Sequence, residues 1–139
     1  MKVYLFGAID IPGVPPTVAY QLEKLINDTN GNISFIVGDN SGFDKQLHMT
    51  LSRLGMASKT EIYGVEYVKT NVFGFKEKIL KQEENEFEPD MYKYRNRLFA
   101  DDCDIAIVVW NGESKSIFER ITLISIRNKP VYQFIIPKV

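Results

Sequence analysis

Apolar residues along the chain fall into short continuous runs that alternate with stripes of helical spacing. Five runs predict strands, at residues 3–9, 33–37, 61–68, 105–109 and 131–136. Residues 91–100 follow Pro89 and are predicted to form a helix. Three further helices are predicted from apolar residues at helical spacing. These residues are Val18, Leu22, Leu25 and Ile26 in the first helix, Phe43, Leu47, Leu51 and Leu54 in the second, and Ile117, Ile121 and Ile124 in the last. The run at 61–68 has a more polar character, as expected of a strand at the edge of a sheet.

The order of these elements predicts the fold class. Strands and helices alternate, and parallel strands joined by right-handed helical crossovers require helices on both faces of the sheet. We therefore expect one α/β domain over residues 1–139, a three-layer sandwich around a five-stranded, mainly parallel sheet. Residues 69–90 interrupt the alternation, and five acidic side chains among residues 83–90 indicate a charged, solvated insertion or a short helix.

Composition narrows the class of protein. An apolar share of 45% and a charged share of 25% are ordinary for a soluble globular domain, and a net charge of -1 gives no support to nucleic acid as a partner. No run approaches the roughly 20 apolar residues of a membrane-spanning helix. The N-terminal apolar run ends after seven residues, at Asp10, without a cleavage site, which does not fit a signal peptide. Cys103 is the single cysteine, so the chain suits a reducing compartment and we expect a cytoplasmic protein.

Parallel α/β sheets bind ligands beyond the carboxyl ends of their strands, where the strand order reverses. This rule selects the loops at residues 7–16, 38–44 and 110–116. The ligand-binding positions predicted in these loops are Gly7, Gly38, Asp39, Ser41, Gly42, Asp44, Asn111, Gly112, Ser114, Lys115 and Ser116.

The second loop has the composition of a phosphate-binding turn. Gly38 and Gly42 would let the backbone pass close to a ligand, and the helix that begins near Ser41 would attract a phosphate through its free N–H groups. Asp39 and Asp44 would accept hydrogen bonds from a ribose or from the backbone. The alternative is a plain strand-to-helix turn that is capped by Ser41 or Asp44.

The third loop offers the same arrangement more fully. Gly112 permits a tight turn, Ser114 and Ser116 supply hydroxyls at a helix start, and Lys115 adds a cation. The alternative is again structural, because Ser116 and Glu119 have the spacing of a capping box. Glu119 is therefore a candidate for either a helix cap or a catalytic acid.

A few other polar residues are candidates for chemistry. Arg95 lies on the helix before the fourth strand, where its guanidinium would bind a phosphate or pair with a surface acid. His48 is the only histidine and lies beside an apolar stripe, so we expect it to pack and expect no metal site. Trp110 is expected to fill the end of the sheet, with stacking on a base as the alternative.

Two segments of the chain resemble a known family. The segment VGDNSGFDKQLHMTL is similar to the VGDANGADKAIQ segment of small SLOG-superfamily proteins, which are Rossmann-like relatives of the Lonely-guy phosphoribohydrolases. The segment DIAIVVWNGESKSIFERITLISIRNKPVYQF is similar to their DYGLMIWDGKSKGTLNNI…GKPVVVY segment. The resemblance implies a Rossmann-like fold, a nucleotide-type ligand and a homodimer.

The resemblance can be followed residue by residue. The matching positions are Gly38, Gly42 and Asp44 in the first segment, Gly112, Ser114 and Lys115 in the second, and Arg95 near an arginine that precedes the fourth strand in these families. The chain differs where the family has Gly-Thr, because Ser116 and Ile117 stand there, and Asn111 replaces an aspartate. The phosphoribohydrolase motif PGGxGTxxE is absent, although Glu119 stands near its acid.

These observations leave three functions open. The first is the binding of a nucleotide or nucleotide-derived ligand, in a regulatory or defence role, without a cofactor. The second is an N-glycosidic hydrolase or transferase in which Glu119 acts as nucleophile or general base, Arg95 holds a 5′-phosphate and Ser114 contacts the sugar. The third is an interaction scaffold whose pocket has lost its ligand.

Overall fold

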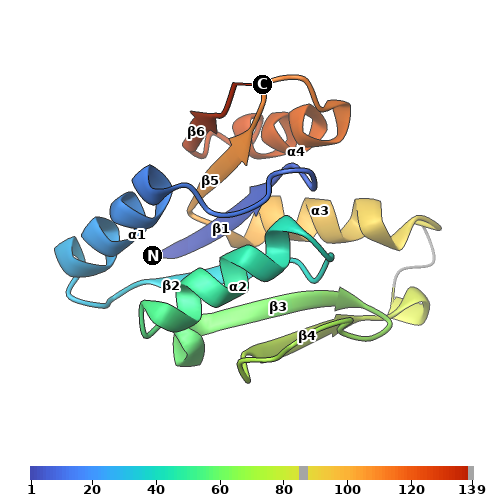
Figure 1. Ribbon diagram of the computed structural model, residues 1–139. Helices are drawn as coiled ribbons and strands as arrows, with labels where there is room; N and C mark the ends of the chain where they lie inside the picture. Colours follow the sequence, from blue (N-terminus) through green and yellow to red (C-terminus); the bar gives the residue numbers. More distant parts are fainter. Residues whose placement is uncertain (85–87, 138–139) are drawn as a thin grey trace.

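The structure, a computed structural model, describes residues 1–84 and 88–137. Within these residues one sheet of six strands has the order β4-β3-β2-β1-β5-β6, and every neighbouring pair is parallel (Figure 1). The strands are β1 Lys2–Gly7, β2 Ser34–Val37, β3 Thr60–Val65, β4 Lys76–Leu80, β5 Ile105–Trp110 and β6 Val131–Ile135.

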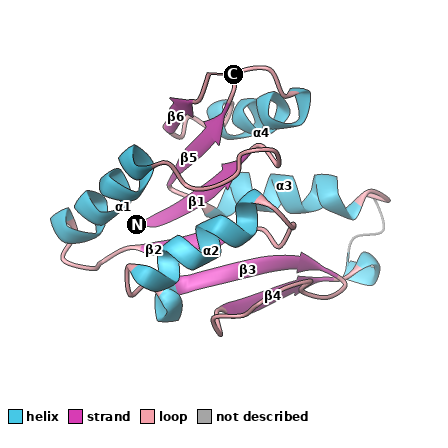
Figure 2. Cartoon of the chain, in the orientation of Figure 1, coloured by secondary structure: helices cyan, strands magenta, loops and turns pink. Residues whose placement is uncertain are grey.

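Helices cover both faces of this sheet. They are α1 Pro16–Asp28, α2 Phe43–Arg53, α3 Met91–Asp102 and α4 Lys115–Ser125, with short 3-10 turns η1 Ala57–Lys59 and η2 Gln82–Glu84. Helices α1 and α2 lie on one face and α3 and α4 lie on the other (Figures 1 and 2). The prediction of an α/β fold with a parallel sheet between two helical layers is confirmed.

The number of strands and the position of the sheet's edge need correction. The sheet has six strands and not five, because β4 lies inside the segment 69–90 that the sequence predicts as an insertion. Its exposed Lys76 and Glu77 hide the apolar pattern, and only Leu80 is buried. Because β4 is the edge strand, β3 is an interior strand, contrary to prediction. Part of the predicted insertion, residues 85–87, falls outside the described residues.

Strand order reverses beside β1. The chain passes from β1 to β2, β3 and β4 on one side, and then returns to place β5 and β6 on the other. Val3 therefore pairs with Phe35 of β2 on one side and with Ile105 of β5 on the other. The loops after β1 and β5 lead to helices on opposite faces of the sheet, α1 and α4, and this leaves a crevice at the carboxyl ends of the two strands (Figure 1).

A stack of aromatic rings fixes α3 against the sheet. The ring of Tyr4 lies 4.2 Å from that of Phe99 and 4.4 Å from that of Phe6, and Tyr63 lies 4.7 Å from Phe99. All four side chains are buried. Each such pair typically contributes about 0.5–1.5 kcal/mol beyond the burial of its area. The stack holds the helix that carries Arg95.

The helix starts differ in how they are capped. Ser114 caps α4 by accepting a hydrogen bond from Ile117 N at 3.3 Å, so the predicted capping box of Ser116 and Glu119 is wrong. Helix α2 begins after Gly42, which has no side chain to cap it. None of the helices among the described residues is long and apolar enough to cross a membrane.

Candidate functional site

A cavity of about 250 Å³ lies where the strand order reverses. We call it the switch-point cavity, and its walls come from the end of β1, the start of α2 and the start of α4. Its lining residues are Gly7, Ala8, Ile9, Asn40, Ser41, Phe43, Asp44, Ser114, Ser116, Ile117 and Arg120. Residues far apart in the sequence therefore meet at the edge that the topology selects.

The structure brings five of the predicted ligand-binding residues together in this cavity: Gly7, Ser41, Asp44, Ser114 and Ser116. The other predicted residues lie outside its lining: Gly38, Asp39, Gly42, Asn111, Gly112, Lys115, Arg95 and Glu119. The two loops after β2 and β5 thus face each other as expected, although only part of each loop contacts the cavity.

Two glycines shape the cavity through packing. A Cβ atom on Gly7 would lie 2.5 Å from the ring of Phe43 and 2.6 Å from the carbonyl oxygen of Val109, so only glycine lets α2 approach β1. Gly42 has a φ of 88°, a conformation that favours glycine, and its backbone packs against Ile9. These glycines bring the start of α2 to the end of β1, which creates the wall of the cavity.

Asp44 places a buried carboxyl group in that wall. Its side chain is 8% exposed, and its Oδ2 atom accepts a hydrogen bond from Asn40 N at 3.0 Å. Burial raises the pKa of Asp44, and the hydrogen bond from Asn40 and the positive charge of Arg120 only partly offset this effect. A carboxyl group in such a position can accept a hydrogen bond from a ligand or, when protonated, donate one.

Arg120 is the main residue of the cavity that sequence reasoning missed. Its guanidinium lies 5.8 Å from the ring centre of Phe6, and its Nη2 atom donates to Ser116 Oγ at 3.4 Å. Its Nε atom is buried and, within the described part of the chain, has no hydrogen-bond partner. The sequence does indicate the position of Arg120, because residue 120 is three positions after Ile117 and four before Ile124 and so lies on the side of α4 that faces the sheet.

Asp39 and Arg95 bind each other beneath the loop. Arg95 Nη1 lies 2.7 Å from Asp39 Oδ1 and donates to the carbonyl oxygen of Tyr63 at 3.0 Å. Asp39 Oδ2 also accepts a hydrogen bond from Lys69 N at 2.9 Å. Both charged side chains are at least 95% buried, with exposures of 5% and 1%. The pair ties the loop after β2 to β3 and α3, so these two residues position the site from below.

The start of α4 carries the remaining predicted residues of the third loop. Asn111 Oδ1 accepts a hydrogen bond from Glu113 N at 2.9 Å, which forms the turn around Gly112. Lys115 is exposed at the first position of the helix, and Glu119 is exposed one turn later. Glu119 lies outside the residues that line the cavity.

His48 and Trp110 have the packing contacts expected of them. His48 is buried, and its Nε2 atom lies 2.8 Å from the carbonyl oxygen of Gly38. Trp110 is buried at the end of β5 and donates from Nε1 to Gln133 Oε1 at 3.1 Å. Residues 1–84 and 88–137 contain no group of three or more His, Cys, Asp or Glu side chains that could hold a metal ion.

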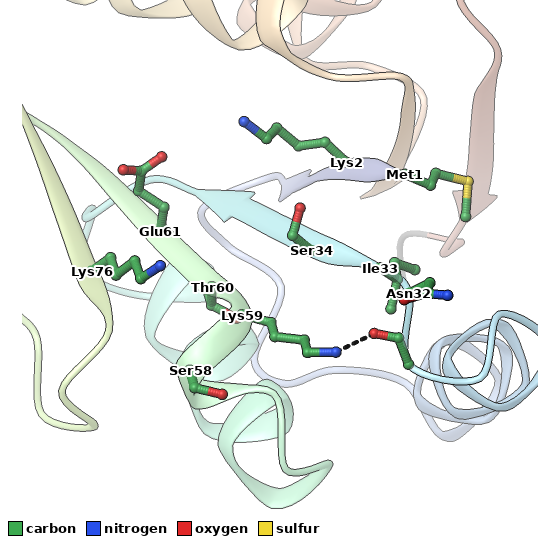
Figure 3. A pocket seen from close by; sticks show the side chains of 11 residues that line it. Met1, Lys2, Asn32, Ile33, Ser34, Ser58, Lys59, Thr60, Glu61 and Lys76 are labelled. Atoms are coloured by element: carbon green, nitrogen blue, oxygen red, sulfur yellow. Dashed lines mark hydrogen bonds between the residues drawn. The ribbon is translucent and has the colours of Figure 1, made fainter.

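A second and larger cavity, of about 550 Å³, lies at the opposite edge of the sheet (Figure 3). Lys2, Lys59 and Lys76 reach it from three different elements. Lys59, however, already donates to the carbonyl oxygen of Gly31, at the end of the turn that follows α1. This edge has the carboxyl ends of α1 and α2, where lysines complement exposed carbonyl groups. Its cations therefore have a structural explanation.

The chain was compared with protein-family models, curated proteins and solved structures, and none of them matches. A function can therefore be argued only from the chemistry of the switch-point cavity.

Proposed function

We propose that the protein binds a nucleotide or nucleotide-derived ligand in the switch-point cavity, with an anionic group held by Arg120 and by the starts of α2 and α4. The observation that carries the proposal is that Arg120 and the buried Asp44 line the same cavity. A buried carboxyl group with a raised pKa that lies in a cleft with a cationic side chain is characteristic of ligand sites.

Free backbone donors support an anion in this position. No acceptor among the described residues reaches the N–H groups of Phe43, Asp44 and Lys45 at the start of α2. The N–H groups of Lys115 and Ser116 at the start of α4 also have no acceptor among the described residues. Two helix dipoles therefore direct positive ends and unpaired donors towards one crevice. Arg120 adds a guanidinium, which binds phosphate oxygens through two parallel hydrogen bonds.

The size and polarity of the cavity fit part of a nucleotide. Its volume of about 250 Å³ is below the range of roughly 300–1,000 Å³ that encloses a drug-sized ligand. We infer that it encloses a phosphate and a sugar, with Asp44 and Ser41 bonded to sugar hydroxyl groups. Glu119 is exposed outside the lining, which favours binding over the alternative in which Glu119 cleaves a glycosidic bond.

Calorimetry with AMP and with ribose 5-phosphate tests this proposal. Arg120→Met keeps an unbranched side chain over Phe6 and removes the charge, so we expect affinity to fall by about ten- to a hundredfold. Lys76→Met removes a charge at the other edge and is the matched control, with affinity unchanged. Thermal unfolding checks that both variants are folded. The proposal is wrong if the folded parent protein binds neither ligand, or if Arg120→Met binds them as tightly as the parent.

A further inference from the structure

A groove of about 490 Å³ adjoins the switch-point cavity on the other side of the start of α2. Its walls are the turn at Ser41 and Gly42, the outer side of α2, and the segment that leads towards β4. The lining residues are Ser41, Gly42, Lys45, Gln46, His48, Met49, Thr70, Val72 and Phe73. Ser41 lines both spaces, so a ligand that fills the cavity needs only to pass this exposed turn to enter the groove.

His48 presents an unused hydrogen-bond acceptor at this groove. Because a carbonyl oxygen only accepts, the 2.8 Å contact with Gly38 O requires Nε2 of His48 to carry the proton. Burial lowers the pKa of His48, which keeps the ring neutral and leaves a lone pair on Nδ1. No donor in the described part of the chain reaches Nδ1, although the side chain is only 3% exposed. Nδ1 is not among the buried atoms of the described residues that lack a partner, and His48 lines the groove. An accessible acceptor at the wall of a groove fits a ligand that supplies an N–H group.

The opposite wall of the groove is apolar. Val72 is 76% exposed and lines the groove together with Phe73, which follows it in the chain. Met49 completes this surface from α2. A flat ring placed here would contact Phe73 and Met49 with its face, while its edge met His48. Lys45 and Thr70 supply polar groups at the rim.

We propose that the groove holds the base of the nucleotide, and that His48 Nδ1 accepts a hydrogen bond from an exocyclic amino group of that base. This inference rests on the proposed function, because it places one end of the same ligand. It gives the ligand a direction, with the phosphate at Arg120, the sugar at Asp44 and Ser41, and the base over Phe73. It also makes His48 and Phe73 residues that determine specificity, a role that sequence reasoning did not assign to either.

Three ligands separate this inference from the proposed function. Ribose 5-phosphate lacks a base, IMP carries an oxygen where AMP carries an amino group, and AMP has every part. Stacking and the hydrogen bond to His48 should each contribute about tenfold. We therefore expect calorimetry to give AMP about tenfold tighter binding than IMP, which keeps the ring, and about a hundredfold tighter binding than ribose 5-phosphate, which lacks the base. Equal affinity for all three ligands overturns the inference and leaves the proposed function standing. Binding of none of them overturns both.

Variants and a direct measurement complete the test. Phe73→Ala should weaken AMP about tenfold and leave ribose 5-phosphate unchanged, whereas Phe73→Trp should restore AMP binding. His48→Leu, if thermal unfolding shows it to be folded, should bind AMP and IMP equally. For the parent protein we expect nuclear Overhauser contacts between the adenine protons of AMP and the ring of Phe73, which need no variant. Contacts of bound AMP with other residues, and none with Phe73 or Met49, overturn the inference.

Discussion

The two edges of the sheet both carry charged side chains, but these differ in sign and in burial. At the edge where the strands begin, Lys2, Lys59 and Lys76 line a cavity (Figure 3), and none of the three is buried. At the edge where the strands end, Asp39, Asp44 and Arg95 are buried, and Arg120 has a buried nitrogen without a partner in the described residues. The charges that are energetically expensive to bury therefore lie at the carboxyl edge, Asp44 in the lining of the smaller cavity and the pair of Asp39 and Arg95 outside that lining.

This difference is why we propose the smaller cavity, and not the larger one, as the ligand site. Helices in a parallel α/β sandwich run opposite to the strands, so their positive ends gather at the carboxyl edge of the sheet and their negative ends at the amino edge. Lysines at the amino edge stabilise helix ends, as Lys59 does with Gly31. Buried acids at the carboxyl edge lie among groups that would stabilise a ligand, and they weaken the free protein. The cost of burial is our reason for proposing that the ligand binds at the carboxyl edge.

The largest expected effect concerns the buried ion pair. Arg95→Met removes the partner of Asp39 and leaves its carboxylate buried, so the free energy of unfolding should fall by about 3–5 kcal/mol. Lys59→Met at the other edge should change it by no more than about 0.5 kcal/mol. Urea unfolding measures both values. Similar losses for the two variants would remove the contrast between the edges.

The second effect has the opposite sign. Asp44→Asn keeps an oxygen that accepts from Asn40 N and removes a charge whose burial raises the pKa of Asp44. The folded state binds this proton more tightly than the unfolded chain does. The free energy of unfolding of the parent therefore falls once the pH exceeds the ordinary carboxyl pKa, and it continues to fall until the pH reaches the raised pKa of Asp44. Asp44→Asn should therefore be more stable than the parent at pH 7 by about 0.5–2 kcal/mol.

The pH dependence of that gain is its control. Urea unfolding at pH 4, close to the ordinary pKa of a carboxyl group, should show a smaller difference between Asp44→Asn and the parent, because the unfolded parent then also binds much of this proton and little of the cost of ionisation remains. A variant that is less stable than the parent at pH 7 would mean that the charged form of Asp44 supports the fold. The burial of Asp44 would then say nothing about a ligand.

Burial also explains which strands could be predicted from the sequence. The strands β1, β2 and β5 are predictable because they are buried on both faces and read as continuous apolar runs. The edge strand β4 is hidden, because Lys76 and Glu77 face solvent and leave no alternation to detect.

The site was predictable only in part. The loops that form it follow from the order of the strands, and five of their predicted residues line the cavity. The ion pair of Asp39 with Arg95 joins residues 56 positions apart, and no local spacing encodes such a contact. Arg120 was missed because its place beside the stripe of Ile117, Ile121 and Ile124 looks like that of an ordinary charged residue at the edge of an amphipathic helix.

A third and smaller effect is expected at the start of α4. Lys115 is exposed there, outside the cavity lining, so it acts on an anion at a distance. Lys115→Glu should weaken AMP binding by about 1 kcal/mol at low salt, and by less as salt rises, because the Coulomb interaction is screened. Its free energy of unfolding should change by no more than about 0.5 kcal/mol. Calorimetry at two salt concentrations measures the effect, and unchanged affinity at both would reduce Gly112–Ser116 to a capped turn.

The smallest effect is expected at the amino edge of the sheet. The double variant Lys2→Met and Lys76→Met removes two cations from the larger cavity. AMP affinity should stay within about twofold of the parent value, because this cavity lies at the amino ends of the strands, away from the switch-point cavity. A tenfold loss, measured by calorimetry, would place the anion site at the wrong edge.

A crystal structure of the protein with AMP tests the central claim most directly. We expect the phosphate to lie between the starts of α2 and α4, within hydrogen-bond distance of the Arg120 guanidinium and of backbone N–H groups around Phe43 and Ser116. The opposite result is a phosphate among Lys2, Lys59 and Lys76 at the amino edge. That position would contradict the assignment of the ligand site to the switch-point cavity.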